Sequence, residues 1–256
     1  MATKKSESSE RSLENYLYSS DKARIYALVQ QMTIGAREAL AKAVAGLRTL
    51  DVGAEEDVVC GDDAIDELEE QIDQECLYSI AMRQPMREDL RYVYAVMKII
   101  TDIERIGDQA VNVAERLKEY VNDYHGRAPL PKIDDLLDVS RRCGEMIDDF
   151  LAALDKEDGG VLAVIREKRR ETVRICRKCA ESLMQRLSSP YLAETPAEIF
   201  ITIDLFRHLK RVADHLMNLG EKVYFIATGV SPLTLKRELV SRGCSHEDSH
   251  PTESAK

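Results

Sequence analysis

The sequence predicts an all-α protein built from two tandem three-helix bundles. Aromatic residues make up only 5% of the 256 residues and Trp is absent, whereas helix-favouring Ala, Leu, Glu and Arg are abundant. Apolar residues recur at helical spacing through most of the chain. The pattern of residues 98–115 also returns about 106 residues later, in residues 204–221, and a repeat of this length indicates a duplicated domain.

In the first half, Gly53 and Pro85 divide the helical periodicity into three helices. These helices span roughly residues 13–50, 54–82 and 86–120. Residues 1–11 are polar and are expected to be disordered. Since a segment rich in Gly and Pro follows the third helix, we place the first bundle at residues 12–126.

In the second half, a Gly-Gly turn at residues 159–160 and the break at Pro190 again separate three helices. They span roughly residues 133–154 and 161–187, and from beyond Pro190 to about residue 227. The second bundle is placed at residues 127–230, and residues 231–256 are expected to form a disordered polar tail. Cys244, His246 and His250 lie in this tail, where we expect solvated side chains, with weak chelation of a metal as the alternative.

The net charge and the hydropathy of the chain argue against nucleic-acid binding, lipid binding and a membrane span. A net charge of −10 argues against nucleic-acid binding and against adhesion to anionic lipid. No apolar run approaches the ~18 residues of a membrane span, and residues 1–10 have no apolar signal core. We therefore expect a cytoplasmic protein with reduced cysteines that reaches a membrane only through partners.

The third helix carries a stripe of carboxylates. At about 100° per residue, Glu104, Asp108 and Glu115 fall within roughly 40° of one another, at the border of the buried arc. Asp102 points away from this stripe. The basic residues of the helix are expected to face outward: Lys98, Arg105 and Arg116.

A second acidic stripe lies on the preceding helix. Four carboxylates share one face within roughly 60°. They are Asp62, Asp66, Glu69 and Asp73. Residues 61–81 contain eight carboxylates and no basic residue, so salt bridges along the helix cannot neutralise them. A solvated face is one explanation; but two acidic rows on helices packed ~8–10 Å apart would repel unless pKa values rise or a cation binds.

The sequence therefore predicts a metal site formed by both stripes. Its ligands would be Asp62, Asp66, Glu69, Asp73, Glu104, Asp108 and Glu115. Oxygen ligands suit divalent or trivalent ions such as Fe, Mn, Mg, Ca or Zn and do not choose among them.

These residues also carry a family resemblance. Glu104-Arg-Ile-Gly-Asp108, within IERIGDQAVNVAE, resembles the E/D-x-x-x-D signature of the PhoU family of phosphate-uptake regulators. The second copy, QPM at residues 84–86 and YxxxTG at residues 224–229 extend the resemblance over roughly residues 12–230. It implies tandem bundles, metal clusters in some members, and a homodimer that acts as a negative regulator. The implied partners are a phosphate ABC transporter ATPase and a sensor histidine kinase.

The second half departs from this pattern. Asp214 and Glu221 occupy the family's ligand positions, but Lys210 stands where the first copy has Glu104. The helix over residues 161–187 includes a segment with seven basic residues against two acidic ones. We therefore expect Lys210 to act as a counter-ion in place of a metal ion. The opposite charges of the two halves would suit oriented docking, although solvated faces remain an alternative.

No catalytic constellation is visible, so an enzyme is not expected. Cys176 and Cys179 have CxxC spacing but fit two core positions one turn apart. His208 points about 160° away from Lys210 and is expected at the surface. Two alternatives to a regulator stay open: a metal-dependent phosphatase or redox enzyme that uses the acidic site, and a metal-free helical interaction module serving another ion transporter.

Overall fold

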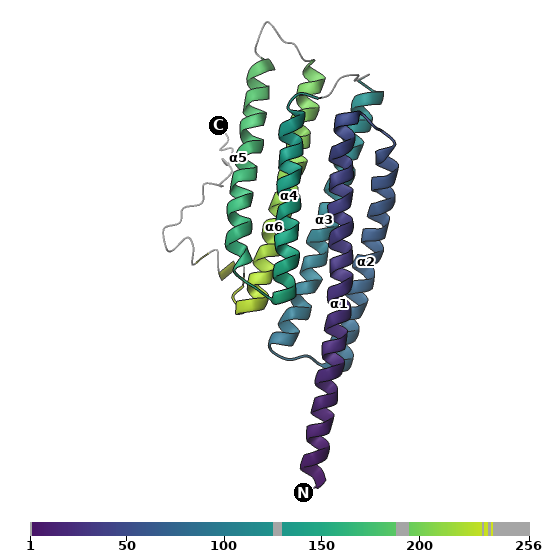
Figure 1. Cartoon of the computed structure of the whole chain (residues 1–256), viewed down its shortest axis with the longest axis vertical. Coiled ribbons are helices and arrows are strands. Elements are labelled where there is room, and N and C mark those ends of the chain that lie inside the picture. The colour runs from purple at the N-terminus through teal and green to yellow at the C-terminus, as the bar shows by residue number, and fades with distance from the viewer. Residues whose placement is uncertain (1, 125–129, 188–194, 232, 235–236, 238–256) are drawn as a thin grey trace, which may run out of the picture.

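The computed structural model describes residues 2–124, 130–187, 195–231, 233–234 and 237, and only the backbone of residues 2–17 and 54. This part of the chain forms long α-helices and contains no strand, as predicted (Figure 1). The helices are α1 (Ala2–Thr49), α2 (Ala54–Arg83), α3 (Glu88–Asn122), α4 (Ile133–Lys156), α5 (Val161–Leu187) and α6 (Pro196–Thr228).

The first helix is longer than the sequence predicts. It begins at Ala2, so residues 2–11 lie within α1 although their polarity suggested disorder. No Gly or Pro interrupts the chain before Gly35, and Ala, Lys, Glu and Arg near its start favour a helix. Cys244, His246 and His250 lie outside the described residues.

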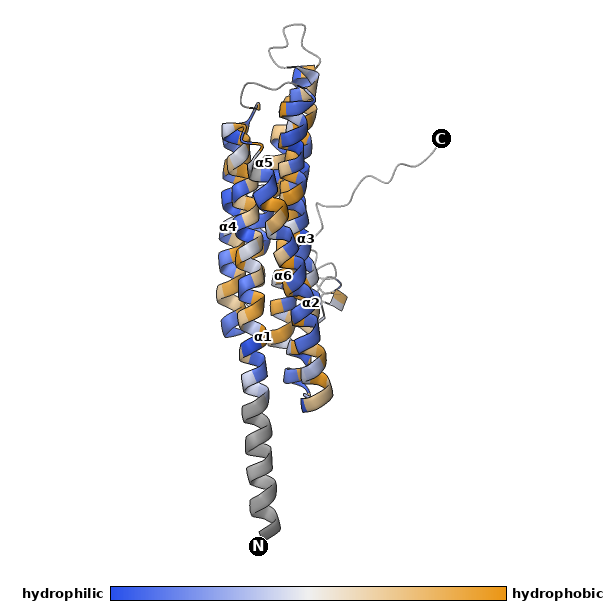
Figure 2. Ribbon diagram, turned by 90° about the vertical axis from the view of Figure 1, so that its right-hand side faces the viewer, coloured by the Kyte–Doolittle hydropathy of each residue, from blue (hydrophilic) through white to orange (hydrophobic). Residues whose placement is uncertain are grey.

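The helices pack as two bundles. In the first, α1, α2 and α3 contact one another, and in the second, α4, α5 and α6 do so. The bundles meet along their length because α3 packs against α6 and α1 against α4 (Figure 1). Apolar and polar residues alternate along the coloured parts of the helices (Figure 2), and nearly all buried apolar residues of both bundles belong to one continuous core.

Because α3 lies between α6 and the rest of its own bundle, it buries two faces. The predicted arc is buried, from Val96 through Ile103 to Ala114. Asp102 and Gln109 are buried as well. This second face contains polar residues, and a pattern of apolar periodicity alone does not reveal it.

The start and end of α6 have clear local causes. Thr195 and Glu198 form a capping box in which the Thr195 side chain accepts a hydrogen bond from the Glu198 amide, and Pro196 opens the helix. Gly229, at φ 75°, ends it. No helix in the described part of the chain is long and apolar enough to cross a membrane.

Candidate metal centre

The two acidic stripes face each other where α2 and α3 approach closely. Gly107 makes this approach possible: a Cβ atom at this position would lie 2.7 Å from Asp62 Oδ1 and 3.0 Å from Ile65 Cδ1. About two turns further along the contact, Thr101 Oγ1 donates a hydrogen bond of 3.1 Å to Glu69 Oε1. The absence of a side chain at Gly107 therefore leaves room for the Asp62 carboxylate against α3.

The half-buried Asp62 carboxylate has one oxygen without a hydrogen-bond partner. Its Oδ1 atom is buried and has no hydrogen-bond partner. Burial raises the pKa of Asp62 to about 6, and the neighbouring charges of Asp66, Asp108 and Asp63 act in the same direction. The site thus holds a carboxylate that is costly to ionise without a cation.

Glu104 on α3 also has a raised pKa. Burial raises its pKa to about 7, with further contributions from Asp108, Glu69 and Asp66, while Arg105 opposes the shift. We refer to the carboxylates that act on one another here as the acidic cluster: Asp62, Asp66, Glu69, Glu104 and Asp108.

The acidic cluster suits a hard cation by its chemistry. It offers only oxygen ligands, one of them buried and unpaired, and its mutual repulsion would be relieved by positive charge. In the described part of the chain, no three His, Cys, Asp or Glu side chains already converge at metal-binding distances. Binding would therefore require rotations of these carboxylate side chains.

The other two predicted ligands of the first bundle, Asp73 and Glu115, act on groups outside the acidic cluster. Asp73 acts on Cys76: burial raises the pKa of the Cys76 thiol to about 12, and the charge of Asp73 adds to this shift. Glu115 is exposed and acts on His208 at the boundary with α6. The structure thus groups five of the seven predicted residues, and a ligand role for all seven stays a prediction.

The equivalent place in the second bundle contains cations. Arg169 on α5 reaches Asp214 Oδ1 from Nε at 2.8 Å and from Nη2 at 2.6 Å. Lys210 Nζ lies 3.8 Å from Asp214 Oδ2, in agreement with the expected counter-ion. Glu221 is buried, with 5% exposed. The sequence analysis did not predict that Arg169 lies closer to Asp214 than Lys210 does. The internal repeat could have indicated it, because Arg169 occupies the position that corresponds to Asp62 in the first half.

A polar seam joins the two bundles. Asp102 accepts hydrogen bonds from His215 Nδ1 at 2.9 Å and Asn218 Nδ2 at 3.0 Å, and His208 Nδ1 lies 2.9 Å from Gln109 Oε1. The expectation that His208 lies at the surface is wrong, since only 6% of it is exposed. The reason is that α6, like α3, buries a second face.

The environment of His208 keeps the imidazole neutral. Burial lowers its pKa to about 4, and Arg211, Arg116 and Arg207 act in the same direction, whereas Glu115 opposes them. Arg116, which we expected to face outward, crosses the boundary and pairs with Asp204 at 2.8 Å. In the polar seam, His208 therefore contacts Gln109 as a neutral imidazole, although charged side chains lie nearby.

The CxxC cysteines occupy core positions, as expected. Cys176 is 4% and Cys179 6% exposed. Burial raises the pKa of the Cys176 thiol to about 12, so the reactive thiolate is suppressed.

The fold and the site together define a class: helical proteins of two tandem three-helix bundles with a carboxylate cluster in one bundle. The family model of the PhoU domain matches residues 29–117 and again residues 136–223. These two matches cover more than half of the chain. The chain belongs to the PhoU family.

Relatives are similar over most of their length. The "Phosphate-specific transport system accessory protein PhoU homolog" of Aquifex aeolicus is 31% identical over 179 residues, covering 70% of this chain and 75% of that protein. The homolog of Deinococcus radiodurans is 34% identical over 176 residues, covering 66% and 76%.

Solved structures share the fold. PhoU from Pseudomonas aeruginosa matches with a TM-score of 0.75 and 24% identity, covering 83% of this chain and 100% of that one. The regulatory protein PhoU from Streptococcus pneumoniae matches with a TM-score of 0.71 and 20% identity, covering 85% and 98%.

Proposed function

We propose that this protein is a cytoplasmic regulator of phosphate uptake and phosphate-responsive signalling that binds a metal ion in its first bundle. It would act as an adaptor between a phosphate ABC transporter ATPase and a sensor histidine kinase. Membership of the PhoU family carries the phosphate role, because the relatives are named as accessory proteins of phosphate-specific transport. The buried, unpaired Oδ1 of Asp62 supports the metal.

Five carboxylates would hold the ion: Asp62, Asp66, Glu69, Glu104 and Asp108. A bound divalent or trivalent cation supplies positive charge that stabilises the ionised carboxylates. Asp62 would use the oxygen that now lacks a partner, and Glu104 would bind as the carboxylate and release its proton on binding. The ion would tie α2 to α3 and thereby fix the shape of the first bundle.

Exposed apolar side chains support regulation by contact. Several of them lie in the last two turns of α2, in the connection to α3 and in the first two turns of α3, where a partner could cover them. They are Leu77, Met82, Met86, Leu90 and Tyr94, each at least 43% exposed. The buried CxxC thiols offer no reactive nucleophile.

Deletion and complementation test this function. Removing the gene should alter phosphate-responsive transcription or phosphate uptake, and the wild-type chain should restore the response. The pair Asp62→Asn with Glu104→Gln should restore it less well, whereas Glu67→Gln, an exposed acid on α2, should restore it fully.

The enzyme alternative has its own test. If the purified protein hydrolyses phosphate esters, and Asp108→Ala abolishes the hydrolysis, a metal-dependent phosphatase replaces the adaptor. A deletion strain with a normal phosphate response and altered uptake of another ion would instead favour a module that serves a different transporter.

A further inference from the structure

We infer that the second bundle carries its own cations, Arg169 and Lys210, in the place that a metal ion takes in the first, and is therefore stable without metal. The first-bundle half of this contrast rests on the proposed function. The second-bundle half rests only on the contacts of α5 with α6 and on the internal repeat.

The repeat fixes which residues correspond. When α5 is laid over α2, buried residues fall on buried residues: Ile165 on Val58 and Thr172 on Ile65. In the same register, Arg169 takes the place of Asp62. When α6 is laid over α3 by the shared signature, Asp214 falls on Asp108.

The acidic cluster has changed in character at four of its five positions. Arg169 replaces Asp62 and Lys210 replaces Glu104, while an apolar or weakly polar residue stands at each of two more positions. The full correspondence runs from Asp62, Asp66, Glu69, Glu104 and Asp108 to Arg169, Val173, Cys176, Lys210 and Asp214. One carboxylate remains, and two cations now face it.

The contacts show how the pair works. Both Nε and Nη2 of Arg169 lie within 2.8 Å of Asp214 Oδ1, across the α5–α6 contact. In the first bundle the same two positions are Asp62 and Asp108, whose negative charges repel. A forked guanidinium supplies both the charge and the directed hydrogen bonds that this place requires.

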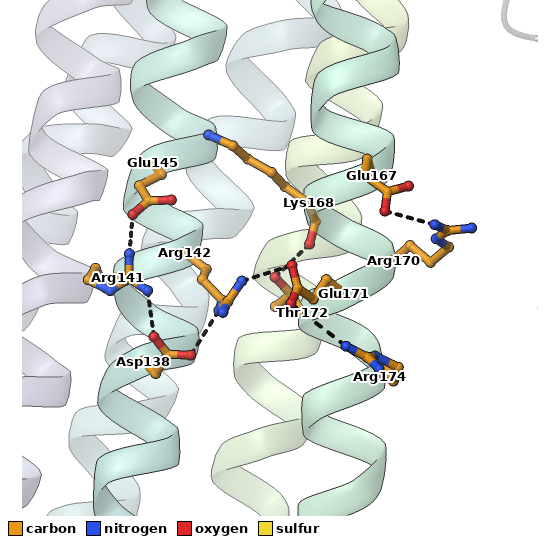
Figure 3. Close-up of polar contacts among 10 residues, drawn as sticks. All are labelled: Asp138, Arg141, Arg142, Glu145, Glu167, Lys168, Arg170, Glu171, Thr172 and Arg174. Atoms are coloured by element: carbon orange, nitrogen blue, oxygen red, sulfur yellow. Dashed lines mark hydrogen bonds and ion pairs between the residues drawn. The ribbon is translucent and has the colours of Figure 1, made fainter.

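Other basic residues of α5, among them Arg170 and Arg174, pair with carboxylates outside the α6 signature (Figure 3). Arg170 pairs with Glu167 on the same helix at 2.7 Å, and Glu171 joins α5 to Arg142 of α4 at 3.1 Å. Lys168 reaches Asp149 of α4 at 2.6 Å. Arg169 thus carries positive charge from α5 onto the signature of α6, which fits a replacement of the ion.

Hydrogen exchange of the full chain, with EDTA or with Mn²⁺, tests the inference. Mn²⁺ should slow the exchange of α2 and α3 and leave that of α5 and α6 in the wild type unchanged. Arg169→Gln should speed exchange in α5 and α6 about two- to fivefold, as expected for a partly exposed ion pair. Asp214→Asn added to Arg169→Gln should have a smaller further effect than Arg169→Gln itself, because only the longer contact of Asp214 with Lys210, at 3.8 Å, is left to break.

Arg170→Gln is the matched control, since Arg170 pairs within α5, and it should leave exchange in α6 unchanged. The inference is overturned if Mn²⁺ slows exchange around Asp214 in the wild type, or if Arg169→Gln exchanges like the wild type. If Mn²⁺ changes nothing in α2 and α3 while Arg169→Gln still speeds α5 and α6, the proposed metal site fails and the assignment of Arg169 stands.

Discussion

We expect Asp62 and Glu104 to make the stability of the first bundle depend on pH. Their pKa values of about 6 and about 7 lie above the ordinary values of 3.8 and 4.5. Between the ordinary and the raised values, the folded state binds more protons than the unfolded state. Protonation of Asp62 and Glu104 therefore stabilises the folded state. This stabilisation is fully present below the ordinary pKa values and is lost as the pH rises through 6 and 7.

Metal-free protein should accordingly melt at a lower temperature at pH 8 than at pH 5.5. Each kcal/mol lost corresponds to a decrease of roughly 2–4 °C for a chain of this size. Differential scanning calorimetry in EDTA would measure it. Asp62→Asn with Glu104→Gln should abolish this dependence and raise the melting temperature at pH 8; a double variant that keeps the slope of the wild type would contradict the assignment.

His208 should produce a dependence of the opposite sign. Its pKa is lowered from 6.5 to about 4, so the unfolded state binds more protons between these values. The stabilisation from neutral His208 is present above pH 6.5 and is lost as the pH falls through 4. In melting curves between pH 4 and 6.5, His208→Gln should lose stability less steeply than the wild type. Equal slopes would show that His208 does not govern this range.

Sequence reasoning reached some of these residues and missed others. Glu104 and Asp108 follow from helical spacing next to an apolar arc. Asp102 and His208 do not, because their burial depends on the packing of α3 against α6, and polar residues on a second buried face look like solvent-exposed ones in a single sequence.

At the scale of the helices, Gly107 decides how closely α2 and α3 approach. Gly107→Ala would place a Cβ atom 2.7 Å from Asp62 Oδ1. We expect it to destabilise the protein by about 1–3 kcal/mol in chemical denaturation, because the packed side chains of Asp62 and Ile65 must shift to make room. It should also weaken metal binding, since Asp62 would be displaced.

Gly61→Ala is the matched control on α2. Its Cβ would meet nothing within 4 Å, so it should stabilise the helix by about 0.5–1 kcal/mol. If both substitutions stabilise the protein, the close contact at Gly107 is not a constraint.

Most helix bounds could be predicted because breakers mark them. The prediction of residues 161–187 coincides with α5, and α2 ends one residue beyond the prediction. The start of α1 could not be predicted in this way, since its first residues are polar but contain no breaker, and polarity alone does not separate a solvated helix from disorder.

At the scale of the whole molecule, the repeat accounts for both the likeness and the difference of the bundles. The fold was predictable because the apolar pattern recurs in both halves.

The partner surface and the homodimer stay predictions. If α2 of one copy docks against basic α5 of another, sedimentation should show a dimer that dissociates as salt rises. A monomer at low salt would contradict this mode of assembly.

The central claim is that the acidic cluster of the first bundle binds a metal ion, and a Mn²⁺ titration followed by thermal unfolding tests it most directly. Protein purified without an affinity tag or chelator should contain metal. After the metal is stripped, Mn²⁺ should raise the melting temperature of the wild type. At a free Mn²⁺ concentration a hundredfold above Kd, the free energy of unfolding should increase by about 2.7 kcal/mol. The variant Asp62→Asn with Glu104→Gln should respond far less. An unchanged melting curve across the titration, with no metal in the purified protein, would contradict the account.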